Sequence, residues 1–387
     1  MQTSIQVGRI IGIPIRLHIS FFIICAGIVF MFAEAPGPFG LGDLEELSTP
    51  FRLSLAAIAA FLFFLSLLLH ELSHSYVAMK YGTKIRGITL FIFGGLAMME
   101  DLPKEPDKEW RIAIAGPLMS FAIGGAFLFT YFGIAAVHVA IYDPLTILLF
   151  SLGLLNVVLA AFNLLPAFPM DGGRVLRAFL AKRMQFLKAT RRAVFVGKTF
   201  AVIMAIVGFM PDPFILYSTG DVRIPFNPFL AFIALFLYVA ATEEESATIT
   251  VATLEGLTVK QVMRTENVSV LEDMAITELV EKMLAEKNAE YAVVNEDGEF
   301  KGFVTFSEIK KLSAEQRYPL TVSDMISAFD GMSDVISQGE EAIEALKRMV
   351  NTKKKVLAVE GEETGKIIGI IAKRDLAMFI EMLKGRG

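Results

Sequence analysis

The sequence is poor in cysteine and in charge, and it has no basic excess. Its one cysteine, Cys25, lies in an apolar run, which excludes a disulfide framework and a multi-cysteine metal site. Only 20% of residues are charged and the formal net charge is -5, so no surface suits nucleic acid as a partner. In contrast, 54% of the 387 residues are hydrophobic, too many for an ordinary soluble enzyme. We therefore expect a membrane protein with a soluble part.

Composition divides the chain near residue 241. Residues 1–241 carry a net charge of +4 and residues 242–387 one of -9, with the change at the acidic run 243–245. Apolar stretches of membrane-spanning length lie near residues 17–33, 53–79, 111–136, 145–168, 193–210 and 227–241. The pattern predicts an α-helical polytopic membrane domain over 1–241, with about six transmembrane helices.

The basic residues between these stretches predict the orientation. Sixteen lie in segments on the side of the N-terminus, and only Arg52 and Arg223 on the other side. Since lysine and arginine accumulate on the cytoplasmic side, both termini are expected there. The first stretch has a long polar lead and no small-residue cleavage pattern after it, unlike a signal peptide. We expect a multi-pass protein of a prokaryotic plasma membrane, with the basic cluster 174–198 facing anionic membrane lipid.

The second apolar stretch contains a metal-binding pattern, His70-Glu71-Leu72-Ser73-His74. Residues four apart share one face of a helix, so the two imidazoles converge on one ion. Gly82, where the helix is expected to stop, is 12 residues past His70, which puts the pattern roughly 10 to 18 Å along the helix from that end. Ionisable residues at such depth face a protein interior, a partner or a watery cavity. A polar pair that only holds helices together would not explain the second imidazole.

Asp171 is the candidate for a third ligand. Catalytic zinc needs three protein ligands and an open position, and Asp171 is the other intramembrane carboxylate with suitable surroundings. Pro166, Pro169 and the glycines 172–173 flank it. They indicate a broken backbone, which is tolerated at membrane depth only where it is buried in protein or lines a cavity.

With these motifs the chain resembles the site-2 protease family of intramembrane zinc metalloproteases. The resemblance rests on His70-Glu71-x-x-His74 and, about 90 residues later, on Asn163-x-x-Pro166-x-x-Pro169-x-Asp171-Gly172. It implies one catalytic Zn²⁺ on His70, His74 and Asp171, with Glu71 activating the attacking water and Asn163 polarising the scissile carbonyl. Ala115-Gly116-Pro117 also matches a motif of that family, with Ser120 in place of its asparagine. The implied substrate is a transmembrane or membrane-associated protein.

Residues 85–99 are too apolar for a plain cytosolic loop and predict a short membrane-associated β-hairpin. Its edge could pair with an unwound substrate strand, because a peptide bond inside a helix is inaccessible until the helix opens. Gly94 and Gly95 are the substrate-binding candidates on this hypothesis. The alternative is a hairpin that only plugs the cavity. Met98 and Met99 are interpreted as hydrophobic filler, and the remaining histidines, His18 and His138, as interfacial or solvated residues.

The acidic C-terminal part contains a duplicated α/β unit. Strands near 291–294 and 302–306 follow a helix near 275–287, and the same order recurs with a helix near 339–351 and strands near 356–359 and 369–372. After a linker at 242–257, the two units resemble a cytosolic tandem pair of CBS (cystathionine-β-synthase-type) domains at 258–315 and 316–387. The resemblance implies binding of ATP or AMP, with Thr305 near phosphate and Asp375 on ribose. Each copy departs from the family pattern, at Glu308 and at Ala372, so a structural role or a homodimer contact stays open.

The leading hypothesis is zinc-dependent intramembrane proteolysis regulated by adenine nucleotide. A CBS-regulated divalent metal transporter is the alternative, with the His and Asp side chains as a transit site. A scaffold without catalysis is less favoured because each expected zinc and water-activating position is filled. Glu71 discriminates the first two, since hydrolysis needs a carboxylate that is not a ligand beside the metal and transport does not.

Overall fold

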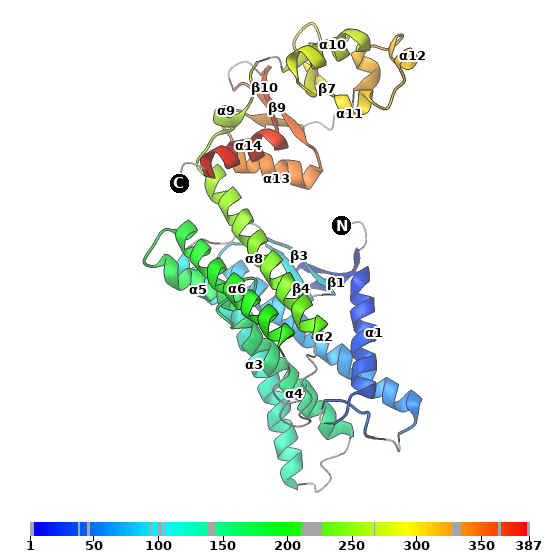
Figure 1. The fold of residues 1–387 in the computed structure, drawn as a ribbon, viewed down its shortest axis with the longest axis vertical. Coiled ribbons are helices and arrows are strands. Elements are labelled where there is room, and N and C mark those ends of the chain that lie inside the picture. The colour runs from blue at the N-terminus through cyan, green and yellow to red at the C-terminus, as the bar shows by residue number, and fades with distance from the viewer. Residues whose placement is uncertain are drawn as a thin grey trace. The chain divides into compact units, whose positions relative to one another are not determined.

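The computed structural model describes residues 4–37, 39–44, 47–92, 94–99, 103, 105–137, 144–210, 227–266, 268–326, 334–362 and 365–384 (Figure 1). The chain forms two compact units, residues 1–246 and 247–387. The first unit contains β1 (Ser4–Ile10), β2 (Ile13–His18), α1 (Ile19–Glu34), α2 (Thr49–Lys80), β3 (Ile85–Phe91), β4 (Gly94–Met99), α3 (Pro106–Val137), α4 (Pro144–Asn163), α5 (Asp171–Ala181), α6 (Phe186–Phe209) and the greater part of α8 (Pro228–Leu254).

The described residues contain fewer membrane-length helices than the sequence suggests. Four of their helices, α2, α3, α4 and α6, are long and apolar enough to cross a membrane. This number is somewhat lower than the expected six for two physical reasons. Helix α1 has only 16 residues because the chain is still a strand up to His18. Helix α8 has a short apolar part, after which it continues through the acidic residues 243–245 to Leu254.

A four-stranded sheet, in the order β1-β2-β3-β4, adjoins the helices of the first unit. The expected hairpin at 85–99 is confirmed as β3 and β4, but β3 also pairs in parallel with β2. The first hairpin, β1 with β2, was not expected; it turns at Ile11 and Gly12, both at positive φ. Buried residues of β2, β3 and α2 share one core: Ile13, Ile15, Ile88, Leu90, Phe64, Leu67 and Leu72. The sheet is thereby fixed to the helix that carries the histidines.

The segment 164–170, between α4 and α5, is packed against glycine. A Cβ on Gly173 would lie 2.6 Å from the Phe168 nitrogen, and one on Gly197 of α6 would lie 2.8 Å from the Phe168 oxygen. Such distances are below any real Cβ contact, so only glycine lets this backbone approach α5 and α6. Phe168 itself is fully buried with Ala193 and Val194. This packing fixes where α5 begins, at Asp171.

The second unit repeats one arrangement of strands. Its first sheet has β5 (Ser269–Leu271) parallel to β6 (Glu290–Val294), which is antiparallel to β7 (Phe300–Thr305). Its second has β8 (Val335–Ser337) parallel to β9 (Val356–Glu360), which is antiparallel to β10 (Ile367–Ala372). The helices are α9 (Val259–Val262), α10 (Ile276–Glu286), α11 (Phe306–Ile309), α12 (Ala314–Arg317), the 3-10 helix η1 (Val322–Met325), α13 (Ala342–Thr352) and α14 (Lys373–Lys384). Helices α10 and α13 each connect the parallel strands. The order of helix, strand and strand agrees with the predicted duplication, whereas β5 and β8 were not expected.

Candidate metal centre

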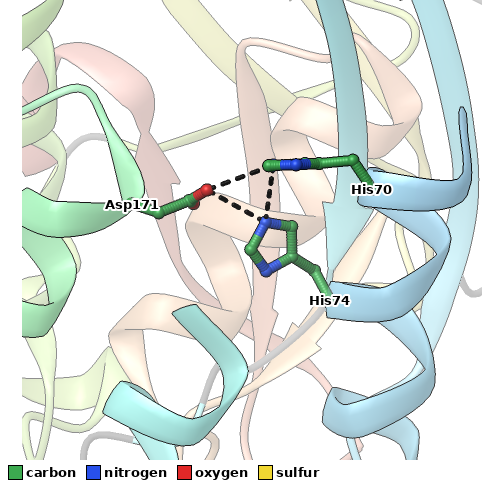
Figure 2. A group of neighbouring side chains, drawn as sticks. All are labelled: His70, His74 and Asp171. Carbon is green, nitrogen blue, oxygen red and sulfur yellow. Dashed lines mark hydrogen bonds and ion pairs between the residues drawn. The ribbon is translucent and has the colours of Figure 1, made fainter. Parts of the chain in front are cut away.

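Three side chains from two helices meet inside the first unit. His70 and His74 project from one face of α2 toward Asp171, the first residue of α5 (Figure 2). The Asp171 Oδ2 atom lies 3.2 Å from His70 Nε2 and 3.0 Å from His74 Nε2, and the two Nε2 atoms are 3.2 Å apart. Among the described residues, this is the group of His, Cys, Asp and Glu side chains close enough to hold one metal ion.

The spacing of these donor atoms suits zinc. A tetrahedral zinc with bonds of about 2.0–2.1 Å holds its ligand atoms about 3.3–3.4 Å apart, and the three observed separations are 3.0–3.2 Å. Two imidazoles with one carboxylate are also a donor set that zinc takes in catalytic sites, with a fourth position left for water or substrate. Both histidines are buried, at 2% and 5% exposure.

The far nitrogen of each imidazole is held by α3. His74 Nδ1 lies 2.7 Å from the Ile112 carbonyl oxygen, and because a carbonyl only accepts, that nitrogen carries the proton. The His74 Nε2 atom is then the lone-pair donor for a metal. His70 Nδ1 lies 2.9 Å from the hydroxyl of Ser120, which is fully buried. Such contacts orient metal-ligating histidines and fix their tautomer.

Gly116, on the same helix, makes room for the ligand group. A Cβ at this position would collide with Nε2 of His74 and would lie 2.6 Å from Nε2 of His70. The motif Ala115-Gly116-Pro117 is visible in the sequence, but its contact with the histidines is not. The sequence does not show which residues of α3 lie opposite the histidines of α2, because this depends on how the two helices pack.

Glu71 contacts the sheet. It follows His70 on α2, and the backbone of Gly95 on β4 packs directly against it: a Cβ there would lie 3.0 Å from the carboxyl carbon. Gly95 is therefore brought to Glu71, whereas Gly94 stands at φ +127° and a Cβ on it would have no neighbour within 4 Å. The residue next to the ligand His70 thus packs against β4.

Asn163 is not drawn into this group. It is the last residue of α4, and its Nδ2 donates to the Leu159 oxygen one turn earlier, at 3.0 Å. Within the part of the chain that the structure describes, that is the hydrogen bond its side chain makes. The amide would have to leave its own helix to reach a substrate.

Arg177, which the sequence motifs do not single out, anchors α5 behind Asp171. It is 6% exposed; its Nε donates to Glu109 of α3 at 2.7 Å and its Nη1 to Glu244 of α8 at 3.2 Å. The guanidinium also lies 5.0 Å from the Phe168 ring and 4.9 Å from that of Phe186. The sequence shows an arginine six residues after Asp171 and glutamates at the two distant positions 109 and 244. It does not show that they pair, because only the fold brings them together.

Both nucleotide-site candidates of the second unit are engaged with protein partners. The Thr305 hydroxyl donates to Glu308 at 2.9 Å, in a capping box at the start of α11. The Asp375 carboxylate accepts from Arg264 Nε at 2.8 Å and from the Ala372 nitrogen at 3.2 Å. A ligand at either residue would have to displace a protein partner.

The remaining candidates stay outside the centre. His18 caps α1, accepting from the Ser20 nitrogen at 3.2 Å, and Met98 and Met99 are half-buried on β4. His138 lies outside the described residues.

Comparison with known proteins gives a family match in each of the two units. Residues 58–140 and 132–207 match Peptidase family M50, and residues 259–315 match the CBS domain. The chain is similar to a protein named zinc metalloprotease of Methanocaldococcus jannaschii, with 38% identity over 99% of this chain and 98% of that protein. A protein named Rip3 from Mycobacterium tuberculosis is 27% identical over 99% of this chain and 94% of its own length. Among solved structures, the site-2 protease from Methanocaldococcus jannaschii is 39% identical and covers 62% of this chain and 95% of its own, with a TM-score of 0.40.

Proposed function

Because this chain belongs to Peptidase family M50, we propose that it is a zinc-dependent intramembrane protease that cleaves transmembrane or membrane-associated proteins. The observation that carries the proposal is the meeting of His70, His74 and Asp171, whose ligand atoms lie within 4.8 Å of one another. Membership of a peptidase family does not favour the alternative of a metal transporter.

In the proposed site, His70, His74 and Asp171 hold the metal and leave Glu71 free as a base. Zinc bound to three protein ligands lowers the pKa of water to about 7 and polarises a carbonyl. Glu71, the neighbour of a ligand on α2, would take the proton of the attacking water and give it to the leaving amine. The Ile112 carbonyl and the Ser120 hydroxyl would keep both imidazoles turned toward the bound metal.

We assign substrate positioning to β4 and to Asn163. An unwound substrate strand would lie along the edge of β4 at Gly94 and Gly95, next to Glu71, and its main chain would pair with the sheet. Asn163 would donate its amide to the scissile carbonyl after releasing the Leu159 oxygen. Pairing of the substrate strand with the sheet requires an edge strand, and β4 is the last strand in the order of the described sheet.

The membrane placement follows from the basic residues. Since lysine and arginine accumulate on the cytoplasmic side, we place both termini in the cytoplasm and the chain in a prokaryotic plasma membrane. His70 is ten residues before the last residue of α2, Lys80, so the metal site would be about 15 Å along the helix from that cytoplasmic end. Cleavage would then occur in the cytoplasmic half of the membrane.

For the second unit we propose two CBS domains, 258–315 and 316–387, that follow a connection at 242–257 and bind ATP or AMP. The support is the match at 259–315 and the repeated sheet in the following residues. Nucleotide would replace Arg264 at Asp375 and Glu308 at Thr305, and a homodimer would form through these domains. Titration calorimetry of the full chain with ATP and AMP tests this; no heat at millimolar nucleotide would refute sensing.

The catalytic proposal is tested by Glu71→Gln in a cleavage assay with a reconstituted transmembrane substrate. We expect the variant to keep its zinc and lose cleavage, because glutamine has the shape of the base without its proton affinity. Glu34→Gln, at a residue with a 49% exposed side chain that pairs with Arg52 near the start of α2, serves as the matched control and should cleave normally. A chelator should abolish cleavage by the wild type. Proteolysis by Glu71→Gln would contradict the assignment of the base.

A further inference from the structure

An open groove of about 450 Å³ lies on the first unit between α5 and α6. Its lining is formed by Leu176 and Leu180 of α5 and by Arg191, Arg192, Phe195 and Val196 of α6. The two apolar residues of α6 are 70% and 39% exposed. Since α6 has the length and composition of a membrane span, a groove beside it opens toward lipid.

The two arginines of the groove have no counter-charge among the described residues. Neither Arg191 nor Arg192 forms an ion pair or a side-chain hydrogen bond with any residue that the structure describes, although both are exposed. Nearby, Arg177 pairs with Glu244 and Lys198 with Glu245, so these acids are already engaged by other basic residues. Guanidinium groups match the oxygens of phosphate with paired donors, so the rim of this groove suits a phosphate group.

Charge and apolar surface follow one another along α6. Arg192 precedes Phe195 by three residues and Val196 by four, so the three share one face of the helix. Further along, Ile203 and Ile206 continue the exposed apolar surface, at 53% and 55%. Arg191 and Arg192 lie about 8–9 Å from the start of α6, within reach of the membrane interface for a long side chain. From its start onward, α6 therefore presents a site for phosphate, then the apolar groove and then a surface that would face lipid.

We infer that this groove binds one anionic phospholipid. Its phosphate lies between Arg191 and Arg192, and one hydrocarbon chain lies along Leu176, Leu180 and Phe195. Basic pockets between membrane helices on the cytoplasmic side are sites for anionic headgroups. A transmembrane segment of another protein would fill the apolar part but would leave both guanidinium groups without counter-charge. Because α5 begins at Asp171, the bound lipid packs against the helix that carries the third ligand of the proposed metal site.

The test measures lipid bound to the purified full chain by native mass spectrometry, in a neutral detergent after lipid removal. The probes are short-chain phosphatidylglycerol and phosphatidylcholine. Arg191→Gln with Arg192→Gln removes the phosphate partners, and Arg183→Gln with Lys188→Gln removes two charges of the same basic cluster that do not line the groove. We expect the groove variant to bind phosphatidylglycerol about tenfold more weakly or worse, and the control variant to bind it as the wild type does. Val196→Trp, which fills the groove without changing charge, should also weaken binding.

Four results would overturn the inference. Phosphatidylcholine could bind as tightly as phosphatidylglycerol, or the control variant could lose as much affinity as the groove variant. Inorganic phosphate at equal concentration could displace the lipid, which would mean that no apolar contact matters. Finally, a synthetic apolar transmembrane peptide could displace the lipid and bind equally to wild type and groove variant, which would make the groove a docking site for a helix.

Discussion

At the residue scale, Ser120 replaces the asparagine of the family motif and contacts a candidate metal ligand. Its buried hydroxyl meets His70 Nδ1 at 2.9 Å, where an outer partner orients the ligand. We predict that Ser120→Ala lowers zinc affinity about 10- to 100-fold, because the ring loses its fixed orientation. Ser120→Asn keeps a hydrogen-bonding group at this position and should retain most of the zinc affinity. Competition with a fluorescent chelator measures both, and unchanged affinity in Ser120→Ala would contradict the role.

Gly116 gives a second prediction at this scale. Gly116→Ala puts a methyl group against Nε2 of both histidines, so we expect the purified variant to contain little zinc and to be inactive. Gly125→Ala on the same helix is the control, since nothing lies within 4 Å of a Cβ there. Elemental analysis of the purified variants measures their zinc content and tests this prediction. Equal zinc in the two variants would show that the ligand atoms do not meet beside Gly116.

At the scale of elements, Arg177 joins α3, α5 and α8 through Glu109 and Glu244. Removing one partner of a buried ion pair leaves a charge uncompensated, at a cost of about 3–5 kcal/mol. We predict that Arg177→Met lowers both the thermal stability of the first unit and its zinc affinity, because α5 begins at the ligand Asp171.

The control for this prediction is an ion pair that connects α3 with the end of α5 at the surface. Lys182, just past α5, pairs with Asp107 of α3, and both are exposed; an exposed pair contributes little. Lys182→Met should therefore change neither quantity. Adding Glu109→Met to Arg177→Met should restore part of the stability, since it removes the more deeply buried of the two carboxylates that lost their partner. A loss of stability in Arg177→Met with unaltered zinc affinity would limit Arg177 to a structural role.

The same scale shows what the sequence could and could not predict. The meeting of two histidines four residues apart was predicted from helical periodicity, and the hairpin at 85–99 from its apolar composition and its glycines. The parallel pairing of Ile15 with Ile88 joins distant segments, and no local pattern encodes it. The first hairpin was missed because its alternating residues, such as Ile13 and Ile15, were counted as the polar lead of a helix.

Helix ends were also predicted less well than helix existence. The fourth apolar stretch was extended to 168, but α4 ends at Asn163 and the following segment is held by contacts of Phe168 with Gly173 and Gly197. Apolar composition alone does not separate a buried loop from a span. The position of Asp171 at the start of α5 is a product of those tertiary contacts.

At the scale of the whole molecule, each candidate metal ligand lies in the first unit and each candidate nucleotide residue in the second. A chain that ends after residue 257 should therefore keep one zinc per molecule and cleave its substrate, and should lose any response to ATP or AMP. Metal content and cleavage rate with and without nucleotide measure this. Loss of zinc from the shortened chain would mean that the second unit is needed to build the metal site.

The most direct test of the central claim is zinc K-edge X-ray absorption on the purified full chain. The account predicts one zinc per chain with two imidazole nitrogens and otherwise oxygen neighbours at about 2.0–2.2 Å, from His70, His74 and Asp171. A spectrum with fewer than two imidazoles, or with sulfur as a neighbour, would contradict it.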